Sequence, residues 1–226
     1  MKSLKLFILS LCLAVPSAGL ADPDLNSRID RAPLAVKSKQ AQGENASILV
    51  MHQFARCVAD QHQKGAMALL ALPYLSDEQS NAVGSLVGGN EDCMGSDGVG
   101  LRFKPPAIVG GMAEQLIANR YKNANVIRFA GMTDETLDQL SVKPRNYAED
   151  FAQCVVRRDP QKVTQLIQTR PTSDEEAAIV QQLVPHLGPC LVSGQKISLN
   201  KPSVRSILAV GLYRMLASAP ATQATK

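Results

Sequence analysis

Apolar positions recur at helical spacing in two well-separated stretches of the chain. Val50, Phe54, Cys57 and Val58 stand at i, i+4, i+7 and i+8, which places them on one face of an α-helix. The same spacing returns 97 positions later at Tyr147, Phe151, Cys154 and Val155. Each stripe contains a cysteine and begins a similar series of further segments. The pattern therefore predicts the first helix of two similar units.

Start signals predict a second and a third helix in each unit. Asp159, followed directly by a proline, supplies the cap and first position of a second helix in the later unit. Ser76 with Gln79, and Ser173 with Glu176, have the spacing of capping boxes and begin the third helices. We expect these third helices to end near residues 88 and 185, where glycine and proline occur.

A fourth helix is predicted to begin at Pro106 in the first unit and at Pro202 in the second. Its buried positions are expected to be Met112, Leu116, Ile117, Leu208, Leu212 and Tyr213. The second of these helices is apolar nearly all round, and Gly110 and Gly111 in the first allow a close backbone approach. We therefore expect each fourth helix to contact the opposite unit. Short alternating pieces at residues 101–103 and 197–199 predict at most a minor two-stranded β-ribbon.

The two units also match each other residue by residue. At a shift of 97, residues 54–94 have 12 identities in 41 positions, including the elements F-A-x-C-V and S-D-E. Chance would give about two or three. Beyond this region the register shifts by one, so that Pro106 corresponds to Pro202. The pattern predicts a tandem duplication.

Four cysteines follow the first 21 residues, and their spacing repeats with the units. Cys57 and Cys93 are 36 positions apart, as are Cys154 and Cys190. An even number of cysteines in an exported chain predicts two disulfides, and the duplication favours this pairing among the three possible connectivities. Each bridge would contribute roughly 3 to 4 kcal/mol in the chain-entropy model. The predicted fold class is all-α, a tandem duplication of a disulfide-stapled four-helix unit.

The first 21 residues have the layout of a secretory signal. Lys2 and Lys5 precede an apolar run over residues 6–15, and Gly19-Leu20-Ala21 supplies small residues at the cleavage site. The run is shorter than the roughly 20 residues a spanning helix needs. Leu11 before Cys12 argues against lipoprotein processing, while a retained N-terminal anchor stays an alternative. We expect cleavage after Ala21 and a periplasmic or secreted product with no transmembrane helix.

The remaining chain divides into five parts. We expect a flexible N-terminal arm at 22–44, helical repeat 1 at 45–118, a connecting segment at 119–146, helical repeat 2 at 147–217 and a disordered tail at 218–226. A short helix beginning at Thr133 is expected within the connecting segment.

Composition excludes some partners. Without the signal, 22 basic residues (24 minus Lys2 and Lys5) face 20 acidic ones. A net charge near +2 does not provide the clustered basic surface of a nucleic-acid-binding protein. The chain has no Trp and 4% aromatic residues, so stacking platforms for single strands are also lacking.

No motif predicts a catalytic, cofactor or metal site. His52, His62 and His186 fall in different elements, and the four cysteines are assigned to disulfides, so no zinc ligand set is left. Ser85 could pair with His186 as a nucleophile and base, but no G-x-S-x-G elbow is present. Structural histidines are the preferred interpretation.

Two polar stretches are candidate ligand sites. The acidic, glycine-rich residues 88–98 around Cys93 lack the alternating oxygen ligands of a calcium loop, and we interpret them as a flexible turn. Arg157 and Arg158 with Lys162 form a basic spot, which is typical of a solvated helix end and could alternatively meet an anionic partner.

The repeated F-A-x-C-V and S-D-E elements resemble small secreted bacterial proteins that carry duplicated cysteine repeats and have no assigned activity. The resemblance covers most of residues 46–216. It implies export and the fold, and it brings over no functional residues.

The sequence favours a non-enzymatic exported envelope protein that acts by binding a protein or a small ligand. The duplicated features are structural, whereas polar side chains differ between the units. One alternative is a hydrolase with a site between the repeats that joins His186 to a serine and a carboxylate. Another is a carrier of a small apolar ligand in the groove between the two units.

Overall fold

The computed structural model describes residues 44–88, 90–94, 105–140, 142–195, 197 and 199–218. This described part of the chain is helical and has no strands. Its elements in chain order are α1 (Glu44–Gln61), α2 (Gln63–Ala71), α3 (Asp77–Val87), η1 (Glu91–Met94), α4 (Pro105–Arg120), η2 (Val126–Phe129), α5 (Asp134–Gln139), α6 (Tyr147–Arg158), α7 (Pro160–Gln168), α8 (Asp174–Leu187), η3 (Gly188–Cys190) and α9 (Lys201–Ser218). The all-α prediction is confirmed.

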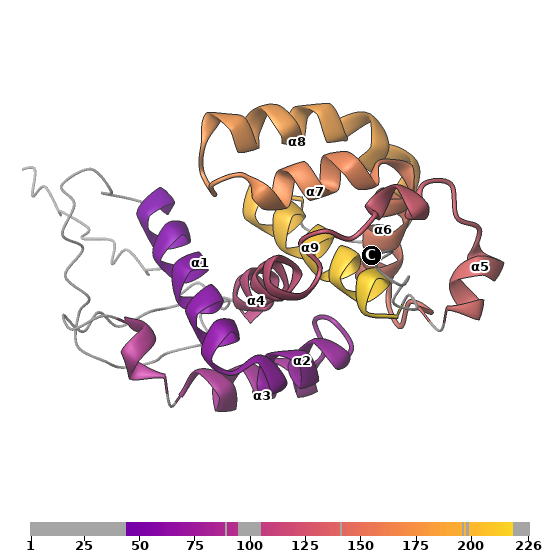
Figure 1. The fold of residues 1–226 in the computed structure, drawn as a ribbon. Coiled ribbons are helices and arrows are strands. Elements are labelled where there is room, and N and C mark those ends of the chain that lie inside the picture. Colours follow the sequence, from indigo (N-terminus) through magenta and orange to yellow (C-terminus); the bar gives the residue numbers. More distant parts are fainter. Residues whose placement is uncertain are drawn as a thin grey trace, which may run out of the picture.

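Helices α4 and α9 lie at the centre of the molecule (Figure 1). Helix α1 packs on α4 and α6 packs on α9, while α2 and α3 lie on one side of this centre and α7 and α8 on the other. We call residues 44–120 the first half and residues 147–218 the second half. The fourth helices of the two halves contact each other, and α9 also contacts α2, as the apolar pattern predicted. The predicted inward positions of both helices are buried.

Small residues allow these helices to approach closely. A Cβ atom built on Gly110 of α4 would lie 2.5 Å from the Ser206 Cβ of α9. Within the halves, a Cβ on Gly111 would lie 2.7 Å from Ala55, and one on Gly211 would lie 2.6 Å from Ala152. Real Cβ atoms do not come this close, so only glycine fits.

The contacts pair the fourth helices differently from the sequence register. Ala55 and Ala152 are 97 positions apart, the same shift as the sequence match between the units, but their partners Gly111 and Gly211 are 100 apart. The register that paired Pro106 with Pro202 relates positions 96 apart, four residues short of this. The pairing of the fourth helices by their contacts therefore differs by one helical turn from the pairing by sequence. Measured from the glycine that packs on α1 or α6, helix α9 begins one turn earlier than helix α4.

The third helices begin with the predicted caps. The Ser76 hydroxyl accepts from the backbone N–H of Gln79, and the Ser173 hydroxyl accepts from that of Glu176, both at 3.1 Å. The side chains of Gln79 and Glu176 accept in turn from the backbone N–H groups of Leu75 (3.1 Å) and Thr172 (2.7 Å). In a standard capping box they would accept from the next residue along the chain, the N-cap serine itself. Leu75 and its counterpart Thr172 both have a φ of 65°, so the two turns share an unusual backbone conformation.

Both predicted disulfides are formed. Cys57–Cys93 joins α1 to η1, and Cys154–Cys190 joins α6 to η3, each across 36 positions. The bridges therefore hold the first helix of each half to the chain that follows its third helix. Disulfides of this kind are typical of an oxidising, extracytoplasmic compartment.

The connecting segment packs on the second half. Thr133 caps α5 as predicted, while the short η2 helix was not anticipated. Phe129 is fully buried, and the backbone N–H of Gly131 donates to the Arg157 carbonyl at 2.9 Å. The Arg157 guanidinium donates to the Met132 carbonyl (2.9 Å) and to Asp134 (2.8 Å). These contacts tie the segment to the end of α6.

Some predicted details differ or lie outside the described residues. Helix α8 continues through Pro185 to Leu187 because the proline removes one N–H without ending the helix. Ile197 and Leu199 do not form a strand, and residues 101–103 lie outside the described part. The signal segment lies outside it too, as do the arm up to residue 43 and the tail from residue 219.

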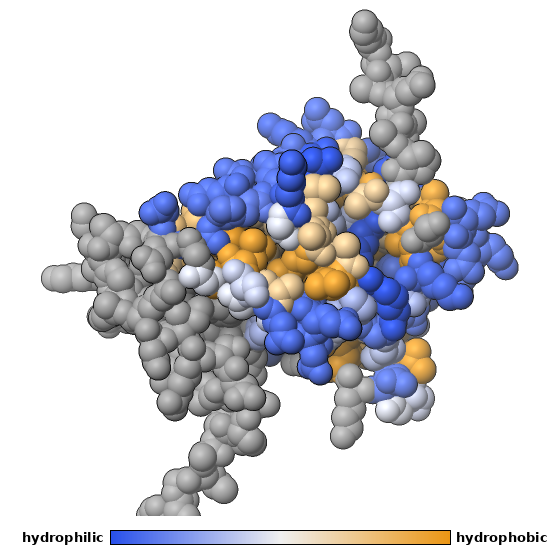
Figure 2. Space-filling model, turned by 90° about the horizontal axis from the view of Figure 1, so that it is seen from below, coloured by the Kyte–Doolittle hydropathy of each residue, from blue (hydrophilic) through white to orange (hydrophobic). Residues whose placement is uncertain are grey.

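Hydrophilic residues cover much of the surface, and apolar residues gather in the middle of the face seen in Figure 2. The large apolar side chains that are most exposed among the described residues are Leu75, Ile127, Val184, Leu191 and Val192. Within the described chain, no helix is both long and apolar enough to cross a membrane.

Candidate binding cavities

Two cavities occupy corresponding places in the halves. Cavity A has a volume of about 390 Å³ and lies between α2 of the first half and α6 and α9 of the second. Cavity B has a volume of about 370 Å³ and lies between α7 of the second half and α1 and α4 of the first, with part of α9. Both volumes lie within the range of small-molecule sites, toward its lower end.

The linings correspond position by position. Four pairs of lining residues are 97 positions apart, and three pairs from the fourth helices are 100 apart. The pairs, with cavity A first, are Met67 and Thr164, Leu70 and Ile167, Ala71 and Gln168, Gln153 and Arg56, Arg214 and Glu114, Ala217 and Ile117, and Ser218 and Ala118. The two cavities thus share a framework but differ in chemistry. Tyr213 of cavity A and Tyr121 of cavity B meet edge to face, with ring centroids 6.2 Å apart.

Cavity B combines apolar walls with cations. Leu212 and Leu216 are buried in its wall, and Arg56 and Lys122 line it as well. The Arg56 Nε donates to Gln115 Oε1 at 2.6 Å. Among the described residues, no carboxylate lies within ion-pair distance of either cation. The remaining lining residues are Glu114, Ile117, Ala118, Tyr121, Ala124, Val126, Thr164, Ile167 and Gln168.

A buried charge cluster lies behind cavity B. Arg205 of α9 forms a bidentate ion pair with Glu114 of α4, at 2.7 and 2.8 Å, and reaches Glu176 of α8 at 3.0 Å. His52 of α1 lies 2.6 Å from the second oxygen of Glu114. Arg205 also donates to the carbonyls of Leu166, Ile167 and Thr169 at the end of α7.

Electrostatics favour the charged forms of Glu114 and Arg205. Burial alone would raise the pKa of Glu114, but hydrogen bonds from His52 and Arg205 outweigh it and hold the pKa below its usual value. Burial lowers the pKa of Arg205, and the hydrogen bond with Glu114 and the charge of Glu176 more than reverse this. The cluster is therefore a structural joint between five helices, α1, α4, α7, α8 and α9.

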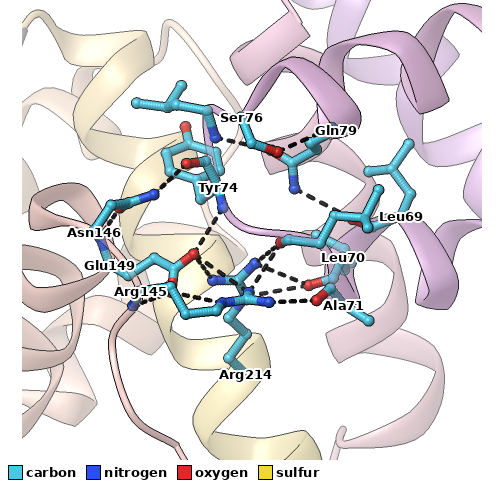
Figure 3. Close-up of polar contacts among 12 residues, drawn as sticks. Leu69, Leu70, Ala71, Tyr74, Ser76, Gln79, Arg145, Asn146, Glu149 and Arg214 are labelled. Atoms are coloured by element: carbon cyan, nitrogen blue, oxygen red, sulfur yellow. Dashed lines mark hydrogen bonds and ion pairs between the residues drawn. The ribbon is translucent and has the colours of Figure 1, made fainter.

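A second cluster borders cavity A (Figure 3). Arg145, before α6, and Arg214 of α9 converge on Glu149 and on the carbonyls at the end of α2. The backbone N–H of Tyr74 donates to Glu149 at 2.7 Å. Arg214 thus donates hydrogen bonds to the backbone carbonyls at the end of α2, as Arg205 does to the carbonyls at the corresponding end of α7.

The second cluster is richer in positive charge than the first. Burial would raise the pKa of Glu149, but the Tyr74 N–H, Arg214 and Arg145 together hold it below its usual value. Burial lowers the pKa of Arg214, and the nearby charge of Arg145 adds to this against the opposing effect of Glu149. Burial also raises the pKa of Tyr74.

The structure does not bring Ser85 and His186 together. The Ser85 hydroxyl donates to the Asn81 carbonyl within α3, while His186 of α8 lies 3.8 Å from Asp159 on the opposite side of the molecule (Figure 1). His186 lines neither cavity A nor cavity B. No group of three or more possible metal ligands is present in the described residues.

The glycine-rich stretch and the basic spot that the sequence offered as ligand sites differ in the structure. Residues 95–98 of the glycine-rich stretch lie outside the described part, and residues 91–94 form η1. Arg157 pairs with Asp134 and caps the connecting segment, and the Lys162 Nζ donates to Gln165 at 3.1 Å. The basic spot is therefore partly engaged in structural contacts.

Sequence reasoning missed the charged residues that matter most for the cavities. Glu114, Arg205 and Arg214 are charges within otherwise apolar fourth helices, and Glu149 and Arg145 belong to the start of α6. A charged residue within an apolar stretch of helix is a sequence signal for a buried ion pair, because such a residue is buried only when it has a partner.

No family model matches the chain, and neither a curated protein nor a solved structure matches it.

Proposed function

We propose that this chain is an exported, non-enzymatic protein that binds a single-chain amphiphile with an anionic head in cavity B. The observation that carries the proposal is that no carboxylate among the described residues pairs with Arg56 or Lys122, which lie beside a wall of leucine side chains. An apolar chain would lie against Leu212 and Leu216, and its head would meet the two cations.

Export rests on two features that agree. Residues 1–21 have a signal layout, and two disulfides are formed, which is typical of proteins in an oxidising compartment. N-terminal sequencing of the native exported protein should give Asp22. Recovery of an intact Met1 in the membrane fraction would instead support a retained anchor.

The carboxylates of the two cavities support binding rather than catalysis. Glu114 and Glu149 are each held by an arginine and by further donors, and both have a lowered pKa. A general acid or base near neutral pH needs the opposite shift. The separation of Ser85 from His186 removes the nucleophile–base pair weighed for a hydrolase.

Calorimetric titration with dodecanoate tests the proposal. We expect saturable binding to the mature protein, and about tenfold weaker binding to Arg56→Glu and to Lys122→Glu, since each loses a charge-assisted contact. Lys143→Glu, an exposed residue of cavity A, is the matched control and should bind normally. Dodecyltrimethylammonium, with the same chain and the opposite charge, should bind far more weakly. Equal affinity of wild type and both cavity B variants for dodecanoate would refute the proposal.

A further inference from the structure

The wall of cavity A carries more positive than negative charge. Lys143, Arg145 and Arg214 line it together with a single carboxylate, that of Glu149. Glu149 is already shared by the two guanidinium groups (Figure 3). Lys143 is exposed, and no carboxylate of the described residues lies within ion-pair distance of it. The cavity therefore has an uncompensated cation at its edge.

Gln153 gives a second, independent observation. Its side chain is only 2% exposed and lines cavity A, yet its amide oxygen is buried with no hydrogen-bond partner in the described residues. No hydrogen bond of its amide nitrogen is present there either. A buried amide oxygen without a donor is unfavourable and uncommon. The oxygen can accept only from a donor on a ligand, whereas the amide nitrogen can donate to an acceptor that enters the cavity.

We propose that cavity A is a second binding site, for a small organic carboxylate. The carboxylate would accept from Lys143 and from Arg145, whose side chain uses four of its five N–H groups within the protein. The Gln153 Nε2 would donate a further bond to the carboxylate, and the body of the ligand would lie against Val142 and Tyr213.

The comparison with cavity B explains why the ligands differ. Position 153 corresponds to Arg56, so cavity A has an amide where cavity B has a guanidinium. Its wall has more charged groups and lacks the two leucines at the base of cavity B. A compact carboxylate fits this lining, whereas a long apolar chain would desolvate charged groups without pairing them. The proposal is independent of what cavity B holds.

Benzoate is the probe for this site, titrated into the mature ¹⁵N-labelled protein and followed by NMR. We expect saturable shifts of the Gln153 side-chain amide resonances, which a purely structural glutamine would not show. Affinity should fall about tenfold in Lys143→Glu and in Gln153→Leu, and stay within twofold of wild type in Arg56→Gln. Benzylamine, of similar shape and opposite charge, should leave the Gln153 signals in place.

Competition separates the two sites. Saturating dodecanoate should leave the benzoate affinity unchanged, so that loss of dodecanoate binding would refute the cavity B proposal without touching this one. Displacement of benzoate by dodecanoate, or unchanged benzoate affinity in Lys143→Glu, would overturn the assignment of cavity A. Lys143 is exposed, so its replacement does not endanger folding.

Discussion

Arg205 and Glu114 form a bidentate ion pair across the two halves of the chain, with both side chains 5% or less exposed. The pair joins α9 to α4, and the same Arg205 side chain also binds the end of α7 and Glu176 of α8. Removing one partner of such a pair leaves the other as a buried, uncompensated charge, which is far less favourable than the intact pair.

Glu114→Gln should therefore destabilise the protein strongly. We expect a loss of about 3 to 5 kcal/mol in the free energy of unfolding, measured by urea denaturation at pH 7. Asp134→Asn is the control, because Asp134 pairs with Arg157 but is 87% exposed, and its loss should cost about 1 kcal/mol or less. Similar losses in the two variants would show that the buried pair is not the joint we describe.

The same carboxylates predict a loss of stability in acid. The pKa values of Glu114 and Glu149 are lower in the folded state than the ordinary 4.5, so the unfolded chain takes up protons first as the pH falls. Their contribution to stability is complete above about pH 4.5 and is lost as the pH falls through the folded-state values. Urea titrations from pH 7 to pH 3 should show this decline in wild type and a shallower one in Glu114→Gln. Parallel curves would contradict it.

The sequence was sufficient for the helices and the disulfides because their signals are local or repeated. The caps at Ser76 and Ser173 and the 36-residue cysteine spacing are examples. The cavities were not predictable in the same way. Arg145 and the end of α2 are more than 70 positions apart, and their contact depends on how the halves dock. The fourth-helix register was also misplaced by a turn, because residues four apart share one face of a helix.

Close packing of α4 on α9 predicts opposite outcomes for two glycines. Gly110→Ala should lower stability by about 1 to 3 kcal/mol, because the new Cβ would overlap Ser206 and force the central helices apart. Gly84→Ala should raise stability by about 0.5 to 1 kcal/mol, because Gly84 is exposed within α3 and has nothing within 4 Å of a new Cβ. Thermal unfolding of both variants measures the contrast. A neutral Gly110→Ala would mean that the two helices can separate freely.

The disulfides should account for a large part of the stability. Replacing Cys57 and Cys93 together by serine should lower the free energy of unfolding by roughly 3 to 4 kcal/mol, mainly by freeing the unfolded chain. The corresponding pair Cys154 and Cys190 closes a loop of equal length and should give a similar loss. Thiol titration of the mature, non-reduced protein should detect none. Two or more reactive thiols would contradict the bridges.

The last prediction concerns the cooperativity of the two halves. Each half supplies groups that the other buries: Arg214 of the second half binds the carbonyls of Leu70 and Leu72, and Glu114 of the first half binds Arg205. Separating the halves would leave Glu114 without Arg205, and Arg214 without these two carbonyls. We therefore expect a single unfolding transition by fluorescence and by calorimetry, and we expect Leu208→Asp, which places a charge at the fully buried centre of α9, to unfold both halves.

Limited proteolysis gives the complementary test. Cleavage within residues 121–146 should release no stable fragment, because Arg145 holds this segment to Ala71 and Leu72 of the first half while Arg157 holds its other part to the second. Leu191→Asp is the control for Leu208→Asp, since Leu191 is 42% exposed and its replacement should leave folding intact. Two separate transitions, or a folded monomeric fragment of either half, would show that the halves are independent domains. A cooperative loss of both would fit central helices that belong to one shared core.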